Sequence, residues 1–163
     1  MNIENLRDLL HHEMKDLWSA ENQIIDALPA MVKAASDQGL RRALEDHLKV
    51  TKKQQSRVEK ICDELDWGPR GHKCAGMEGL IKEGKDLLKE DLPEDVLDAA
   101  IIGAAQRVEH YEMAAYGTAR NHAREIGLDD VADRLQEILD EEGEADKLLT
   151  ELANKRINRE ARV

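Results

Sequence analysis

Helix-breaking residues are rare in this chain and divide it into a few long segments. Proline occurs only at positions 29, 69 and 93 of the 163 residues. Between these breaks apolar residues recur three and four positions apart, which is the period of an amphipathic α-helix. The pattern predicts four long helices, over residues 3–36, 40–66, 93–125 and 129–157, with a bend at Pro29 in the first.

The connection between the second and third long helices is unusually long. Residues 68–92 are glycine-rich at first and then helical over about 77–90. Such a segment is too long for a hairpin turn and fits a lengthwise crossover that contains a short helix. We therefore expect residues 1–163 to form a single all-α domain, a ferritin-like four-helix bundle in which the crossover joins two helical hairpins.

Charge and composition argue against two classes of partner. The formal net charge of -11 repels a phosphate backbone, so we expect no nucleic acid partner. No apolar run approaches the roughly 20 residues of a membrane span, and the N-terminal residues lack a signal-peptide pattern. We expect a cytoplasmic protein without a membrane partner, whose Cys62 and Cys74 are reduced thiols.

Each long helix is apolar at both ends of its buried face and polar in the middle. The polar members are Glu21, then His47, Thr51 and Gln54, then Glu109 and Glu112, and finally Glu142. In a helical hairpin, residues equidistant from the turn meet at one height, so Glu112 should face Glu142, with Glu109 near Asp146. Glu21 should likewise lie near Gln54 or Gln55. The sequence predicts one polar layer across the bundle.

Several buried carboxylates in one layer need compensation, since each would cost several kcal/mol if left unpaired. Arg57 is the clearest basic candidate, and one guanidinium cannot neutralise five acids. A divalent cation can, because carboxylate oxygens suit iron or manganese. We predict a site for one or two such ions with the ligands Glu21, Glu109, Glu112, Glu142 and Asp146.

Four further residues are predicted to support this site. Gln54 and Arg57 lie beside it on the second helix, and Tyr116 is a core residue within hydrogen-bonding reach of a ligand. His47 lies two turns from Gln54, roughly 10 Å by helix rise, which favours a hydrogen-bonding role over direct ligation.

A different class of function is compatible with the same residues. The acids can form a metal-free hydrogen-bonded network with Arg57, Gln54 and His47 inside a non-catalytic structural or interaction protein. Any single glutamate can also lie at the edge of its helix face and reach solvent. Bound metal in the purified protein distinguishes these alternatives.

Four blocks of the sequence resemble the motifs of a known family. They are WSAENQIIDALP (18–29), KCAGMEGLIKEG (73–84), AAQRVEHYEMAAYGT (104–118) and LDEEGEADKLLTELA (139–153). In this order and spacing they are similar to the YciE/YciF-like bacterial ferritin-like family. The resemblance covers nearly the whole chain and implies a ferritin-like bundle, often a homodimer, associated with the stress response and with a metal site inferred mainly from the fold.

The chain departs from the pattern of ferritins and their di-iron relatives in one important respect. Those proteins carry Glu-x-x-His on the second and fourth helices, where this chain has Gln54-x-x-Arg57 and Glu142-x-x-Ala145. The missing imidazoles remove ligands on which iron oxidation relies. We therefore expect metal binding related to stress or oxidants, without fast ferroxidase chemistry, and leave enzymatic activity open.

Overall fold

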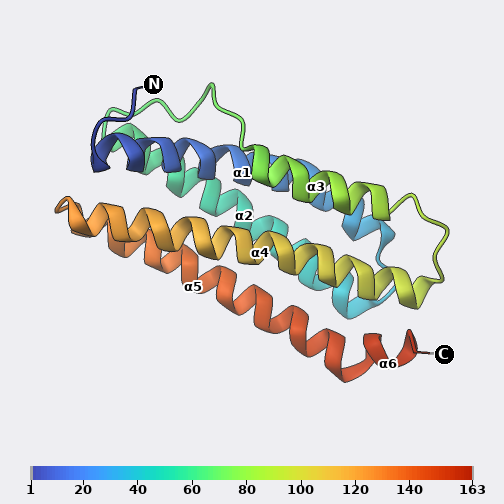
Figure 1. Ribbon diagram of the computed structural model, residues 1–163. Helices are drawn as coiled ribbons and strands as arrows, with labels where there is room; N and C mark the ends of the chain where they lie inside the picture. The colour runs from blue at the N-terminus through green and yellow to red at the C-terminus, as the bar shows by residue number, and fades with distance from the viewer. Residues whose placement is uncertain (1, 163) are drawn as a thin grey trace.

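The computed structural model describes residues 2–162 and consists of helices packed as two antiparallel hairpins (Figure 1). The elements are α1 (Leu6–Ala34), α2 (Gln38–Glu64), α3 (Ala75–Leu87), α4 (Glu94–Glu125), α5 (Asp129–Leu152), a π-helix (Ala153–Ile157) and α6 (Asn158–Glu160). α1 pairs with α2 and α4 pairs with α5, while α3 lies in the crossover against α1 and α4. The all-α ferritin-like bundle with a helical crossover is confirmed.

Side-chain caps explain where the helices depart from the predicted boundaries. Asn5, Asp37 and Cys74 each accept a hydrogen bond from a backbone N–H of the following first turn, so α1 begins at Leu6, α2 at Gln38 and α3 at Ala75. The last predicted helix is not α-helical throughout. Its final turn is a π-helix in which Ala153 and Ile157 are both buried in the core.

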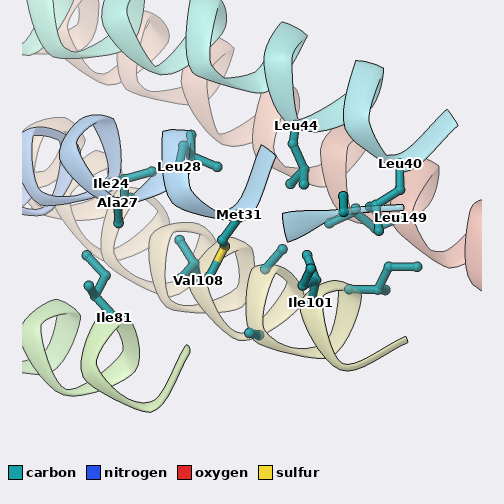
Figure 2. Close-up of a cluster of buried hydrophobic side chains, with 14 of the residues drawn as sticks. Ile24, Ala27, Leu28, Met31, Leu40, Leu44, Ile81, Ile101, Val108 and Leu149 are labelled. Carbon is teal, nitrogen blue, oxygen red and sulfur yellow. The ribbon is translucent and has the colours of Figure 1, made fainter. Parts of the chain in front are cut away.

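Two apolar clusters fill the bundle, one at each end. The first contains Ile24, Leu28 and Met31 of α1 together with residues of the other helices, including α3 (Figure 2). The second is built around Leu10, Met14 and Tyr116 with residues of α2 and α5. Buried polar side chains lie on the same inward helix faces between the apolar ends, as the sequence pattern predicts. Along the described chain no helix is both long and apolar enough to cross a membrane.

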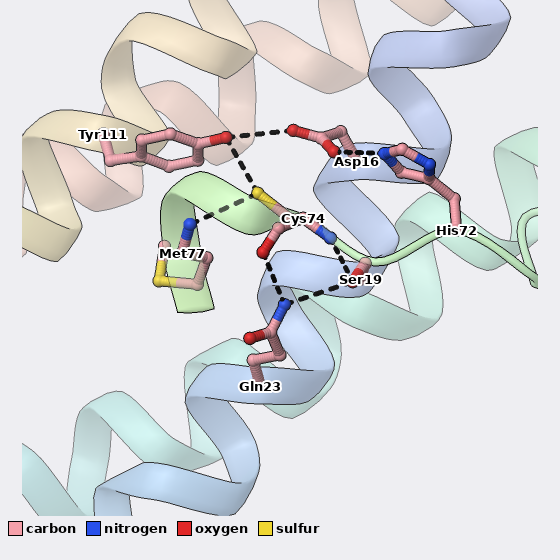
Figure 3. Close-up of polar contacts among 7 residues, drawn as sticks. All are labelled: Asp16, Ser19, Gln23, His72, Cys74, Met77 and Tyr111. Carbon is pink, nitrogen blue, oxygen red and sulfur yellow. Dashed lines mark hydrogen bonds and ion pairs between the residues drawn. The ribbon is translucent and has the colours of Figure 1, made fainter. Parts of the chain in front are cut away.

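The crossover is attached to α1 and α4 by polar contacts around Cys74 (Figure 3). The Cys74 N–H donates to Ser19 Oγ at 2.9 Å, and Gln23 Nε2 donates to the Cys74 carbonyl at 3.0 Å. The Cys74 thiol lies 2.9 Å from the Tyr111 hydroxyl, which donates to Asp16 at 2.9 Å. These contacts hold the start of α3 over the α1/α4 face of the bundle.

Glycine permits the close approach of α3 to α4. A Cβ atom at Gly76 would lie only 2.7 Å from a ring carbon of Tyr111. Any larger residue would push α3 away from the bundle, so this position requires glycine. Gly127 serves a different purpose, since its φ of 77° ends α4 in the left-handed conformation.

Candidate metal centre

Three helices bring one histidine and three glutamates to a single point in the polar layer. His47 comes from α2, Glu109 and Glu112 from α4, and Glu142 from α5. One potential ligand atom of each lies within 4.8 Å of the others. Glu109 and Glu112 are three residues apart and therefore lie on one face of α4, pointing between α2 and α5.

Glu21 extends this cluster on the side of α1. Its side chain is fully buried, and its carboxyl accepts a hydrogen bond from the Tyr116 hydroxyl. Tyr116 is itself fully buried, so the predicted contact between this core tyrosine and an acid of the layer is present.

Gln54 and Arg57 engage the acids of α5 in different ways. Gln54 is fully buried and donates to Glu142, and also to Glu141 at 3.0 Å. The Arg57 guanidinium pairs with Glu141 and lies 4.0 Å from Glu137, at the partly exposed edge of the bundle. Arg57 therefore contacts acids beside the four-residue group and does not belong to it. Glu141 was not predicted as a site residue, and its position next to Glu142 was the only signal for it.

Two further expectations differ from the geometry. Asp146 lies outside the four-residue group, where it accepts from Gln106 at 3.0 Å and lies 3.3 Å from His110. His47, for which hydrogen bonding was favoured over direct ligation, belongs to the group, and its Nε2 lies 3.2 Å from Glu109. The helix rise gave only the distance between His47 and Gln54 along α2. It gave no information on the distance from His47 to Glu109 and Glu112 of α4, which lie close to His47.

Burial changes the protonation of every acid in the layer. It raises the pKa of Glu112 well above its usual range, and the neighbouring Glu142 and Glu21 add to the effect. Burial, together with repulsion from Glu142, also raises the pKa of Glu21 and the pKa of Glu109. The pKa of Glu142 itself is raised by burial. Burial lowers the pKa of His47 to about 4. The metal-free acids therefore hold their protons more strongly than exposed carboxyls do, the His47 imidazole is neutral at neutral pH, and a bound cation would compete with the protons of the acids.

Sequence and fold comparisons show which family the chain belongs to. Residues 5–162 match the family described as a domain of unknown function, DUF892. The chain belongs to the DUF892 family. It is 38% identical to protein YciF of Escherichia coli K12 over 162 residues, which cover 99% of this chain and 98% of YciF.

Solved structures show the same DUF892 architecture. The crystal structure of the E. coli stress protein YciF aligns with a TM-score of 0.92 and 37% identity, covering 96% of this chain and 99% of that one. YcfI from Rhodopseudomonas palustris, for which a structural role has been suggested, aligns with a TM-score of 0.88 and 41% identity over 91% and 95% of the two chains. A protein from Xanthomonas campestris pv. campestris shares the fold at 20% identity, with a TM-score of 0.74.

The donor atoms of this DUF892 chain suit a transition metal. The buried carboxylate oxygens without a hydrogen-bond partner are both of Glu112 and one each of Glu21, Glu109 and Glu142. The His47 Nε2 also lacks a hydrogen bond, because its contact with Glu109 is close but misaligned. One imidazole and several carboxylates form the kind of donor set that iron and manganese accept in proteins. The residues present therefore fit such an ion.

Proposed function

We propose that this protein binds iron or manganese, as one or two ions, inside the bundle and that the bound metal serves a stress- or oxidant-related role. His47, Glu109, Glu112 and Glu142 would hold the first ion, and Glu21, whose charge acts on Glu112, would contribute to a second. The supporting observation is the set of buried carboxylate oxygens without a partner, above all the two of Glu112. Unsatisfied buried polar groups cost stability unless something binds them.

The protein side chains would define the site in distinct ways. Gln54 and Tyr116 donate hydrogen bonds to Glu142 and Glu21, which orients these carboxylates and leaves their other oxygens free. The apolar clusters on either side exclude water, which strengthens the attraction between a cation and the acids. The metal itself would supply any redox chemistry.

One relative suggests the physiological role. YciF is described as a stress protein, and we extend that role to this chain as part of the proposal. Because Glu-x-x-His is missing, we propose metal binding rather than rapid iron oxidation. We also propose a homodimer, the form that the family resemblance implies.

The metal content of the purified protein tests the proposal. The protein is purified without chelator and its metals are measured by mass spectrometry, for wild type, Glu109→Ala and Glu142→Ala. We expect a stoichiometric transition metal in wild type and its loss in both variants. Asp146→Ala is a matched control, since this acid on the same helix as Glu142 lies outside the four-residue group.

A metal-free structural role is the second candidate, and a specific set of contacts favours it. Gln54, Arg57 and Tyr116 together engage Glu141, Glu142 and Glu21 without any ion. If this network is the whole function, the purified protein holds no stoichiometric metal and its melting temperature is unaffected by chelator. That result would exclude the metal proposal.

A further inference from the structure

The α1/α4 face and the α2/α5 face of the bundle differ in what lies over them. α3 lies over the face between α1 and α4 (Figure 1). On the face formed by α2 and α5 there is instead a groove of about 440 Å³. Its lining combines small or apolar residues, a histidine and four acids: Ala43, Val50, Ala145 and Leu148, then His47, then Asp46, Asp140, Glu141 and Glu144.

A second, smaller void continues from the groove into the bundle. It measures about 20 Å³ and is lined by Glu109 and by leucines of α2 and α5. Ala43, His47, Ala145 and Leu148 line both spaces, so the two meet around the same side chains. A void of this size holds about one water molecule. The groove and the void are therefore neighbours, with the groove on the solvent side and Glu109 in the lining of the void.

His47 lies where the groove and the void meet. Its side chain is about nine-tenths buried, and its Nε2 has no hydrogen-bond partner. The ring lines the groove while its Nε2 lies 3.2 Å from Glu109. It is therefore a free nitrogen donor placed between the groove and the acids.

The charges of the groove favour a positive ion. Among the described residues, those lining it include no lysine or arginine. Lys49 and Lys147 pair with Asp46 and Glu144 from outside at 2.7 and 2.6 Å, but both pairs are exposed and weakly held in water. Arg57 pairs with Glu141, and the Asp140 carboxylate accepts only from the neutral Gln136. Within residues 2–162, Asp140 is therefore the one acid of the lining without a cationic partner, and it leaves the rim with a small excess of negative charge that attracts a cation.

We propose that the groove between α2 and α5 is the path by which a divalent cation reaches the metal centre, and that Ala43, Ala145 and His47 form its throat. The inference rests on the proposed metal binding and adds a route and a gate to it. A throat differs from a ligand in its kinetic effect. Narrowing it slows entry and exit by the same factor and leaves the equilibrium affinity unchanged.

The throat is tested by Ala145→Leu, with Mn²⁺ alone as the probe. Uptake by metal-free protein is followed by stopped flow, release is measured by transfer to EDTA, and affinity is measured at equilibrium. We expect uptake and release each to slow roughly tenfold, because opening a filled site displaces packed neighbours. The dissociation constant should stay unchanged. Ala114→Leu, at an exposed position of α4, is the matched control and should behave as wild type.

The acidic rim is tested by a double neutralisation, Asp140→Asn with Glu144→Gln. Uptake should slow, and its dependence on ionic strength should weaken, because fewer charges attract the ion. Glu90→Gln with Asp91→Asn removes the same charge at exposed positions between α3 and α4 and should leave uptake unchanged. If Ala145→Leu does not fold, Ala43→Leu narrows the throat from the α2 side.

The outcomes separate this inference from the proposed function. If wild type binds Mn²⁺ and the filled variants load and release as fast as wild type, the path is wrong while metal binding stands. If only release or only uptake changes, Ala145 affects the bound state rather than a gate, and the inference also fails. If wild type binds no Mn²⁺ and is purified without metal, both proposals fall.

Discussion

Replacing Glu112 with leucine should raise the stability of the metal-free protein. The side chain is buried and neither carboxyl oxygen has a hydrogen-bond partner, so folding removes it from water without compensation. Leaving such a group unsatisfied costs about 1–3 kcal/mol, which is the gain in unfolding free energy expected for Glu112→Leu. In a chain of this size each kcal/mol corresponds to about 2–4 °C in melting temperature.

The gain in unfolding free energy from Glu112→Leu should increase with pH. Burial raises the pKa of Glu112 above its ordinary value of 4.5, so the folded carboxyl keeps a proton that the unfolded one loses. The stability of the metal-free wild type then falls as pH rises above the unfolded pKa, until the folded pKa is passed. Because leucine does not titrate, the difference in unfolding free energy between the variant and the wild type widens from acid to neutral pH.

Metal should reverse the order of stability. Metal at a thousand times its dissociation constant adds about 4.1 kcal/mol to a protein that binds it only when folded, and Glu112→Leu loses this term. Urea unfolding followed by circular dichroism, in EDTA and in Mn²⁺ at several pH values, measures both effects. Glu112→Gln keeps the shape and an unsatisfied polar group, so it should gain less than leucine. A leucine variant less stable than wild type in EDTA at every pH would refute the reasoning.

Three further perturbations have defined outcomes. Asp98→Ala should lower the unfolding free energy by about 3 kcal/mol in urea titrations, because the buried carboxylate accepts three hydrogen bonds from Ser36 and Asp37 at the α1–α2 turn. Gly76→Ala should destabilise by about 1–3 kcal/mol through its clash with Tyr111, whereas Gly79→Ala in the same helix, with open space around it, should stabilise by about 1 kcal/mol. The rise in melting temperature on adding Mn²⁺ should shrink between pH 7 and pH 5, since the raised pKa values of Glu109 and Glu142 make protons compete with the metal.

The fold was largely predictable because helix period and punctuation are local properties. The inward faces of the four long helices are continuous over many turns, and their polar middles are visible without a structure. The boundaries were harder, since they depend on single caps such as Cys74, whose thiol accepts from the Met77 N–H at 3.4 Å. The π-helix at Ala153–Ile157 had no sequence signal, because its register follows from packing at the end of the bundle.

The candidate site was predictable only where hairpin symmetry determines which residues meet. Counting from the turn placed Glu112 with Glu142 correctly, because one short loop connects their helices. The same counting placed Asp146 near Glu109, where its charge contributes to the raised pKa of Glu109, but its carboxylate contacts Gln106 and His110 and lies outside the four-residue group. His47 and Glu109 belong to different hairpins, so their approach depends on how the hairpins dock, which no local pattern encodes.

That docking also explains why the polar layer is tolerated at all. Neither hairpin could bury its acids alone, since each presents one face to solvent until the other covers it. The apolar clusters on both sides of the layer bring the hairpins together, and this burial offsets the desolvation of the acids. A chain selected for stability alone would have no reason to keep five such unpaired oxygens between two well-packed clusters. Four of these oxygens belong to glutamates that meet His47 at a point reached by three helices, and this arrangement supports the proposed binding site over a purely structural role.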